Sequence, residues 1–334
     1  MIDPHLPLID LHRHLDGAVR LETILELGRA HNLPLPAWTR EELRPYVQVT
    51  TPKPGVMAFL EKFEWMTGVL VDEAACRRIA YENVEDAQRE GIDYIELRFS
   101  PYFMSLAHGL NPTGITAAVA DGTAAGQRDF GVRVNLIGII SRTYGVEAGF
   151  KELDALLANR EVICALDLAG DEVRWPAELF KEHFRRARDA GWHITVHAGE
   201  AAGPESIWHA LDLLGADRVG HAVAAPQDER LMQELAKRQI PIECNLTSNV
   251  QTSTVADYAV HPLRQFLEYG IPATINTDDP GISGIDLPYE YEMATRAAGL
   301  SEAQVRQAQL NALEAAFLSV SEKQELFQKK GNPK

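Results

Sequence analysis

The chain has little positive charge, little cysteine and no long apolar run. Its 32 lysine and arginine residues stand against 48 aspartate and glutamate residues, which gives a formal net charge of −16, and no basic run offsets this balance locally. Nucleic acid and anionic membranes are therefore excluded as expected partners. No stretch of about 18 uncharged apolar residues occurs, and no basic segment followed by an apolar one opens the chain, so we expect neither a membrane span nor an export signal.

Cysteine is represented by three residues, Cys76, Cys164 and Cys244, which are far apart and outside any CxxC motif. An odd number of scattered cysteines fits neither a disulfide framework nor a thiolate metal site, and it indicates a cytoplasmic protein. The HxE and PCxxC motifs of the cysteine-containing zinc deaminases are also absent, which excludes that architecture. Hydrophobic residues at 46% and charged residues at 24% are typical of an ordinary folded protein.

Eight short apolar runs, rich in β-branched residues, indicate β-strands. They begin at Leu6, Ile92, Val132, Val162, His193, Arg218, Ile240 and Ile271. Most are apolar at successive positions rather than at alternate ones, which is typical of strands buried on both faces of a parallel sheet. Amphipathic helical segments, such as those from Glu178 and Asp228, separate most of them. This alternation predicts a single α/β domain over 1–334, folded as a (β/α)₈ TIM-type barrel.

A doubly wound sheet is the alternative architecture, and it is less favoured because the GxGxxG motif is missing after the first predicted strand. Far more residues than one helix needs separate the first two strands, and they include helical segments from Leu21 and Met57. We therefore expect a helical insertion after strand 1, over the barrel mouth. Beyond the last strand, Ser301 and Gln304 form a capping-box pattern that predicts additional C-terminal helices.

The predicted strands end in ionisable residues. His12 and His14 close the first strand, and because residues two apart on a strand point the same way, both imidazoles can face one interior point. Later strands end in His197 with Glu200 three residues on, in His221, and in Asp278 with Asp279. In a barrel these ends meet at the C-terminal face, where active sites are built.

Each of these residues also has a purely structural interpretation. A lone HxH pair is more often exposed or bonded within the core, His221 could be a core histidine, and Glu200 could cap a helix. Seven further histidines lie at strand starts, on helices or in loops, and we interpret them as structural or exposed: His5, His31, His108, His183, His193, His209 and His261. Their scatter contrasts with the convergence of the strand-end residues.

Three histidines and one carboxylate form a ligand set suited to a divalent transition metal. A set of His12, His14, His197 and Asp278 predicts zinc, with iron, cobalt or manganese as alternatives, since calcium and magnesium need more oxygen ligands. The fourth predicted strand, VICALDLAGDE, offers no lysine that could be modified to bridge two metals. One metal ion per chain is therefore expected.

Six motifs resemble those of the adenosine deaminase family: HRHLDG from His12, SRTYG from Ser141, DLAGDE from Asp167, HAGE from His197, GHA from Gly220 and NTDDPG from Asn276. The resemblance covers essentially the whole chain and is closest to the bacterial enzymes. It implies the metal-dependent barrel fold and a single zinc ion bound by His12, His14, His197 and Asp278. It also implies catalytic roles for Glu200 and His221, and contacts to the nucleoside from His14, Asp16, Gly170 and Asp279.

The chain departs from the family pattern at two positions. Ala222 follows His221 where the family usually has glycine, and a β-carbon there disfavours a positive φ and could tilt the imidazole. Asn245 stands where the family usually has cysteine, while Cys244 lies one position earlier. Three residues match the family's apolar gate over the pocket and equally fit a helix core: Phe59, Leu60 and Phe63.

The reaction implied by the resemblance is hydrolytic deamination of adenosine and 2′-deoxyadenosine to inosine and 2′-deoxyinosine, with release of ammonia. Zinc would lower the pKa of a bound water from about 15.7 to about 7. His221 would accept the proton of that water, and Glu200 would donate one to N1 of the purine. Asp279 would share a proton with N7, the backbone N–H of Gly170 would bond N3, and Asp16 would accept the ribose 5′-hydroxyl.

Two alternatives remain open from the sequence. One is a mononuclear zinc deaminase of another amino-purine such as adenine, although deaminases of free adenine resemble HLEG where this chain has HLDG. The other is a nucleoside-binding protein without catalysis. In each case the expected partner is a small purine compound, and no obligatory protein partner is evident.

Overall fold

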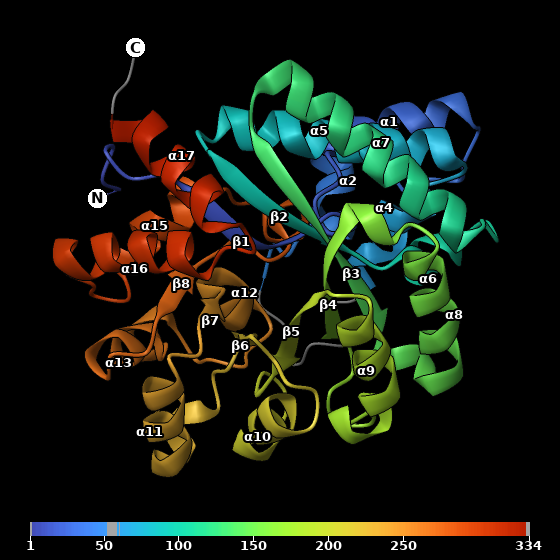
Figure 1. The fold of residues 1–334 in the computed structure, drawn as a ribbon. Coiled ribbons are helices and arrows are strands. Elements are labelled where there is room, and N and C mark those ends of the chain that lie inside the picture. The colour runs from blue at the N-terminus through green and yellow to red at the C-terminus, as the bar shows by residue number, and fades with distance from the viewer. Residues whose placement is uncertain (1, 52–58, 60, 332–334) are drawn as a thin grey trace.

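The computed structural model describes residues 2–51, 59 and 61–331, and it forms a barrel of eight parallel strands (Figure 1). The strands run in chain order around the barrel: β1 (Ile9–His14), β2 (Tyr94–Phe99), β3 (Arg133–Ser141), β4 (Ile163–Ala169), β5 (His193–Ala198), β6 (Arg218–His221), β7 (Ile242–Cys244) and β8 (Ala273–Ile275). An isolated parallel bridge between Arg13 and Asp278 joins the first strand to the segment after the last. The predicted (β/α)₈ barrel is confirmed, with its strands in sequential order.

Helices surround the strands. They are α1 (Leu21–Ala30), α2 (Arg40–Val47), η1 (Glu61–Phe63), α4 (Glu64–Gly68), α5 (Glu73–Arg89), α6 (Pro101–Ser105), α7 (Pro112–Phe130), η2 (Arg142–Tyr144), α8 (Gly145–Leu157), η3 (Arg160–Val162), η4 (Ala177–Phe180), α9 (Lys181–Asp189), α10 (Pro204–Asp212), η5 (Ala225–Gln227), α11 (Glu229–Arg238), α12 (Leu246–Gln251), η6 (Tyr258–Val260), α13 (Leu263–Glu268), α14 (Pro280–Ser283), α15 (Leu287–Arg296), α16 (Glu302–Ala315) and α17 (Val320–Gly331). Among the helices described, none combines the length and apolarity needed to cross a bilayer.

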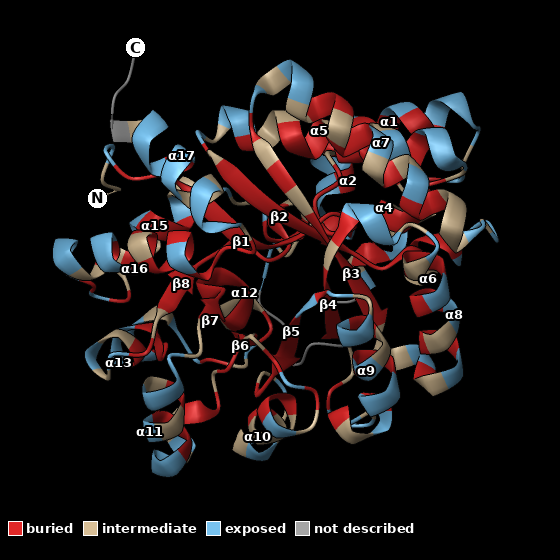
Figure 2. Cartoon of the chain, in the orientation of Figure 1, coloured by how far each residue is buried: buried red, intermediate tan, exposed pale blue. Residues whose placement is uncertain are grey.

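The strands are buried almost throughout, while the outer faces of the helices are exposed (Figure 2). Ile9 and Leu11 of β1 pack in one cluster with Tyr94 of β2 and with Ala312 and Leu313 of α16. The pairing of β1 with β2 shifts register between Asp10 and Arg13. Beyond this shift Arg13 turns to Glu90 at the end of α5, while His12 and His14 on either side of it turn to His197 of β5. The histidine pair therefore points to one interior region, as the HxH spacing predicts.

The insertion after strand 1 is helical, as expected, and contains α1, α2, η1 and α4. It joins the C-terminal face of the barrel through Gln48, whose amide donates to the carbonyl of Gly281, and through Val49, whose N–H donates to the carbonyl of Ile282. The helical segment expected from Met57 begins outside the described residues, and Leu60 of the expected gate also lies outside them.

The C-terminal helices close the opposite end of the barrel. Ser301 and Gln304 form the predicted capping box at the start of α16. After α16 the chain passes beneath the strands, where the backbone N–H of Phe317 donates to Glu96 Oε1 at 2.7 Å. The Phe317 ring packs on Ile137 and lies 3.6 Å from the guanidinium carbon of Arg218. Phe317 therefore plugs the end of the barrel away from the strand-end histidines.

Candidate metal centre and active site

The four predicted ligand residues bring their metal-binding atoms together at the C-terminal face of the barrel. His12 Nε2 and His14 Nε2 lie 3.1 and 3.2 Å from His197 Nε2. The same two nitrogens lie 3.2 and 3.3 Å from Asp278 Oδ1. Ligands held at about 2.0–2.1 Å around a tetrahedral zinc ion are about 3.3 Å apart, so these residues fit a zinc-sized cation.

Two other combinations of nearby ligand atoms share Asp278. The first adds His221 to His12, His197 and Asp278, and the second joins His14, Asp278 and Asp279. His221 Nε2 lies 3.9 Å from Asp278 Oδ2, farther than His14 Nε2 lies from Oδ1 of the same carboxylate. The distances therefore favour His14 over His221 as the fourth ligand, with His221 directly beside the set.

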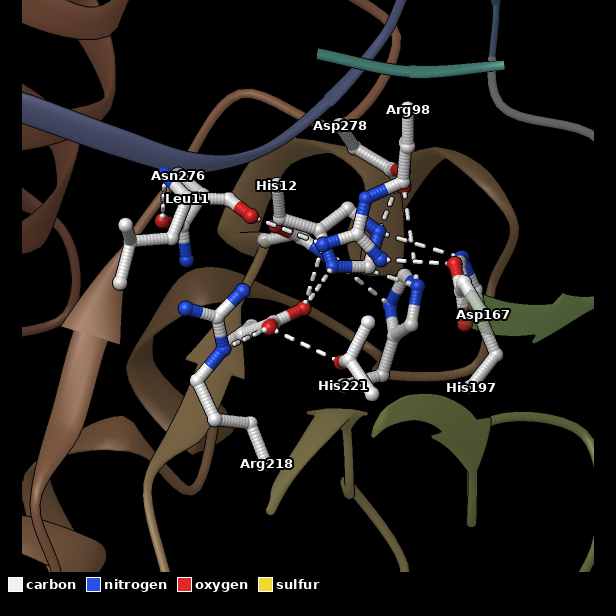
Figure 3. A network of polar contacts seen from close by, with 12 residues as sticks. Leu11, His12, Arg98, Asp167, His197, Arg218, His221, Asn276 and Asp278 are labelled. Carbon is white, nitrogen blue, oxygen red and sulfur yellow. Dashed lines mark hydrogen bonds and ion pairs between the residues drawn. The ribbon is translucent and has the colours of Figure 1, made fainter. Parts of the chain in front are cut away.

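Buried carboxylates hold two of the histidines in place. His12 Nδ1 bonds Glu243 Oε2 at 2.6 Å, and His197 Nδ1 lies 3.0 Å from Asp167 Oδ2. Arg98 links both pairs, since its guanidinium donates to Asp167 Oδ2 and to Glu243 Oε2 at 2.8 Å each. Carboxylates bonded to Nδ1 fix the orientation of the imidazole and turn Nε2 toward a metal. Figure 3 shows Arg98 beside Asp167, with His12 and His197 facing one another.

The charges of this network keep the supporting carboxylates ionised. Burial by itself opposes ionisation of Glu243, but Arg98 and Arg218 hold its pKa well below the usual value. In the same way, His197 and Arg98 lower the pKa of Asp167 against the effect of burial. Both carboxylates are therefore permanent acceptors for the imidazole N–H groups.

His221 has a different kind of support. Asn249 Nδ2 donates to His221 Nδ1 at 3.0 Å, and Asn249 Oδ1 accepts from His261 Nε2 at 3.2 Å. The backbone N–H of Leu263 donates to His261 Nδ1, and burial lowers the pKa of His261 to about 3, so this histidine is neutral with its hydrogen on Nε2. The chain of hydrogen bonds presents His221 Nε2 toward Asp278. His261, which the sequence indicated to be structural or exposed, is thus buried behind His221.

Glu200 lies on the loop after β5, with its Oε1 3.8 Å from His221 Nδ1. Burial raises the pKa of Glu200 to about 7; His221 opposes the shift, and Asp278 and Glu172 add to it. Burial also raises the pKa of Asp279 well above its usual value. A buried carboxyl with a pKa near neutrality can carry a proton for transfer.

A cavity of about 200 Å³ opens beside these residues. Its polar lining includes the predicted substrate-binding residues His14, Asp16, Gly170 and Asp279 together with Glu200 and His221. The opposite wall is apolar and includes Phe59, Phe63 and Phe103. Asp16 Oδ1 and Asp279 Oδ1 are buried with no hydrogen-bond partner among the described residues, so both remain available to a ligand.

Two glycines leave room for neighbouring side chains in and beside the cavity wall. Gly170 has φ +108°, and a β-carbon there would lie 2.4 Å from Thr143 Oγ1. At Gly17 a β-carbon would lie 1.7 Å from Asp279 Oδ1. Larger residues at either position would therefore displace the cavity wall.

The two departures from the family pattern both lie next to His221. Ala222 adopts φ +52° and His221 adopts φ +63°, so the β-carbon of Ala222 does not prevent the left-handed conformation that the sequence made us doubt. Such residues carry backbone strain of about 1–2 kcal/mol each. Asn245 Nδ2 lies 3.4 Å from both ring nitrogens of His221, so this position contacts the imidazole directly.

Sequence reasoning missed the residues that support the histidines. They are Glu243, Asp167, Arg98, Asn249 and His261, of which only Asp167 occurs in a motif quoted above. The available signal was a charged residue inside an otherwise apolar strand, as in YIELRF and IEC. A charge buried in this way requires a partner.

The family model and the relatives matched by sequence agree on one family. The family model described as adenosine deaminase matches residues 7–330. Adenosine deaminase of Escherichia coli O1:K1 / APEC is 59% identical over 329 residues, covering 98% of this chain and 99% of that protein. The adenosine deaminase of strain IAI39 of the same species matches at the same identity and coverage.

Solved structures share the fold at lower identity. Adenine deaminase from Arthrobacter aurescens is 27% identical with a TM-score of 0.91, covering 97% of this chain and 98% of that one. An amidohydrolase from Burkholderia ambifaria with bound Zn is 27% identical with a TM-score of 0.88, covering 98% of this chain and 90% of that one.

Proposed function

Since the chain belongs to the adenosine deaminase family, we propose how its active-site residues carry out the hydrolytic deamination of adenosine and 2′-deoxyadenosine. The protein is a hydrolase whose substrate is a purine nucleoside, and it contains a buried site of three histidines and one aspartate that suits a metal. The proposal concerns the identity of the metal, the role of each residue and the contacts to the nucleoside.

The metal is one zinc ion per chain, held by His12, His14, His197 and Asp278. Four contacts of 3.1–3.3 Å between their ligand atoms support this assignment. When bound, zinc supplies a nucleophile at neutral pH by lowering the pKa of water from about 15.7 to about 7. The amidohydrolase with bound Zn is a relative with the same fold.

Two residues act on the reacting groups. Because His221 Nδ1 accepts from Asn249, the hydrogen of the imidazole stands on Nε2, which donates to the attacking water and orients it beside the ligand set. Glu200 donates a proton to N1 of the purine, because attack at C6 places negative charge on that nitrogen. A pKa of about 7 leaves a substantial fraction of Glu200 protonated when substrate binds.

The nucleoside is held by the remaining polar residues of the cavity. Asp16 Oδ1 accepts the ribose 5′-hydroxyl, and protonated Asp279 donates to N7, which supports these roles because both Oδ1 atoms lack a partner. The backbone N–H of Gly170 bonds N3, and His14 contacts the nucleoside beside the metal. Phe59 and Phe63 form the apolar gate over the base.

The alternative substrate is free adenine, which the fold shared with an adenine deaminase brings into consideration. The chain is 59% identical in sequence to adenosine deaminases but only 27% identical to that adenine deaminase. This difference favours adenosine over free adenine as the substrate. The three cysteines are free, which supports the proposal that the enzyme works in the reducing cytoplasm.

The direct test measures loss of the adenosine ultraviolet band by a zinc-replete preparation, with free adenine assayed on the same sample. Glu200→Gln should retain zinc and nucleoside binding while turnover falls by about 10²- to 10⁴-fold. Glu205→Gln, which removes one carboxylate from an 87% exposed side chain on α10, is the matched control and should keep full turnover. Retained activity in Glu200→Gln would remove this residue from the acid role.

A further inference from the structure

A single carboxylate, that of Glu172, accepts hydrogen bonds from the backbone of the loop that carries Glu200. Glu172 accepts hydrogen bonds from four successive backbone N–H groups: Gly199 at 2.6 Å, Glu200 at 3.1 Å, Ala201 at 2.8 Å and Ala202 at 3.0 Å. The hydroxyl of Ser206, in the first turn of α10, donates to the same carboxylate. Both oxygens take part, Oε1 with Gly199 and Ser206 and Oε2 with the other three.

Glu172 comes from a different part of the chain, the segment between β4 and η4, and it is only 5% exposed. Within the described part of the chain these four N–H groups have no other acceptor, since they precede α10 and have no helical partner. Gly199 is buried, and an unpaired buried N–H costs about 1–3 kcal/mol, so this end of the loop depends on the carboxylate for its conformation.

These hydrogen bonds fix the backbone on both sides of Glu200, the proposed proton donor. Gly199, Glu200 and Ala201 are consecutive residues bonded to the same side chain, so the Cα of Glu200 lies between two tethered peptide groups. Gly199 also adopts φ +67°, where a β-carbon would lie 2.5 Å from Ile207 Cδ1. Only the side-chain torsions of Glu200 remain free to place its carboxyl in the cavity.

We propose that Glu172 is a positioning residue for the proton transfer: it holds the 199–202 backbone so that the carboxyl of Glu200 meets N1 of the purine. Glu172 does not line the cavity, so it acts on the reaction through Glu200. The inference rests on the acid role proposed for Glu200.

Two substitutions separate the charge of Glu172 from its length. In Glu172→Gln the new amide group would face backbone N–H donors and break part of the array, whereas Glu172→Asp keeps the carboxylate but shortens its reach. Displacement of a reacting group by about 1 Å can cost about 100-fold in rate. We expect Glu172→Gln to lower kcat by about 10- to 100-fold with only a small change in KM, and Glu172→Asp to recover part of that loss.

A double-mutant cycle distinguishes positioning from a general structural role. If Glu172 acts through Glu200, its substitution costs nothing further once Glu200 is glutamine. The variant Glu172→Gln/Glu200→Gln should therefore retain the residual kcat of Glu200→Gln within about 2-fold. Two losses that multiply, in variants with equal zinc content, would overturn the proposal.

The outcomes separate this inference from the proposed function. Should Glu200→Gln keep its activity, the acid role fails and this inference fails with it. Should Glu200→Gln be inactive while Glu172→Gln turns over as fast as the Glu205→Gln control, only the positioning role fails. If Glu172→Gln does not fold, Glu172→Asp enters the same cycle with Glu200→Gln, and the same two results apply.

Discussion

Replacing Glu243 by glutamine should weaken zinc binding specifically, because Glu243 is the acceptor that orients His12. Its Oε2 bonds His12 Nδ1 at 2.6 Å, and its Oε1 bonds Arg218 Nε at 2.7 Å and Thr195 Oγ1 at 2.9 Å. A glutamine amide has one acceptor oxygen, so one end of this arrangement must lose its bond. Loss of such an outer partner typically costs 10- to 100-fold in metal affinity, or about 1.4–2.7 kcal/mol.

The same substitution also removes a buried charge, so stability must be measured separately. Breaking a buried ion pair costs about 3–5 kcal/mol when the partner is left alone. Here Arg218 keeps Glu96 and Arg98 keeps Asp167, and we therefore expect a loss at or below the lower end of that range.

Glu96→Gln is the matched control. Glu96 is equally buried and bonds Arg218, the Tyr94 hydroxyl and the Phe317 N–H, but it touches no histidine. Both variants should lower the free energy of unfolding of the metal-free protein in urea. Competition with a chromophoric chelator should show weaker zinc binding for Glu243→Gln alone. Equal zinc affinities in the two variants would refute the orienting role of Glu243.

Three further predictions follow from the site. With Glu200 near pKa 7, kcat/KM should fall as pH rises through about 7, because the acid form is lost; a profile flat across that range would contradict its role as donor. Ala222→Gly should raise the free energy of unfolding by about 0.5–1 kcal/mol. Glycine relieves about 1–2 kcal/mol of left-handed backbone strain but adds about 0.4–1 kcal/mol of conformational entropy to the unfolded chain. A less stable variant in a denaturant titration would disprove the strain. Asp16→Ala should lower the ratio of adenosine to adenine kcat/KM by about 10- to 100-fold, the value of a hydrogen bond to a charged acceptor, and an unchanged ratio would reject the ribose contact.

The fold was predictable because each strand of the barrel is an apolar run of its own. All eight runs form strands. The helices between them were predictable because their apolar residues recur every three to four positions, unlike the continuous apolar runs of the strands. Strand starts were less predictable: β7 begins at Ile242 and β8 at Ala273, each two residues after its run begins. Whether a residue joins a strand depends on pairing with a neighbour distant in sequence, and an apolar run does not record that pairing.

The ligand-bearing strand ends were visible for a related reason, since all carboxyl ends of a parallel barrel meet at one face. Their partners were not visible. His12 and Glu243 are 231 residues apart, and His221 reaches His261 only through the side chain of Asn249. A single charged residue in an apolar run indicates that a partner exists, but many assignments of partners satisfy the same sequence.

The barrel interior explains why those charges are there. Most barrels fill this layer with bulky branched residues, whereas here Arg98, Arg218 and the carboxylates Glu96, Asp167 and Glu243 occupy it, all fully or almost fully buried. Apolar replacements of buried ion pairs are often neutral or stabilising, so the network is poorly explained by stability. The two carboxylates that bond Nδ1 of His12 and His197, Glu243 and Asp167, are instead held by Arg98, which ties the orientation of His12 to that of His197. We therefore infer that the interior charges serve the geometry of the proposed metal ligands, while Phe317 stacks on Arg218 at the other end of this layer.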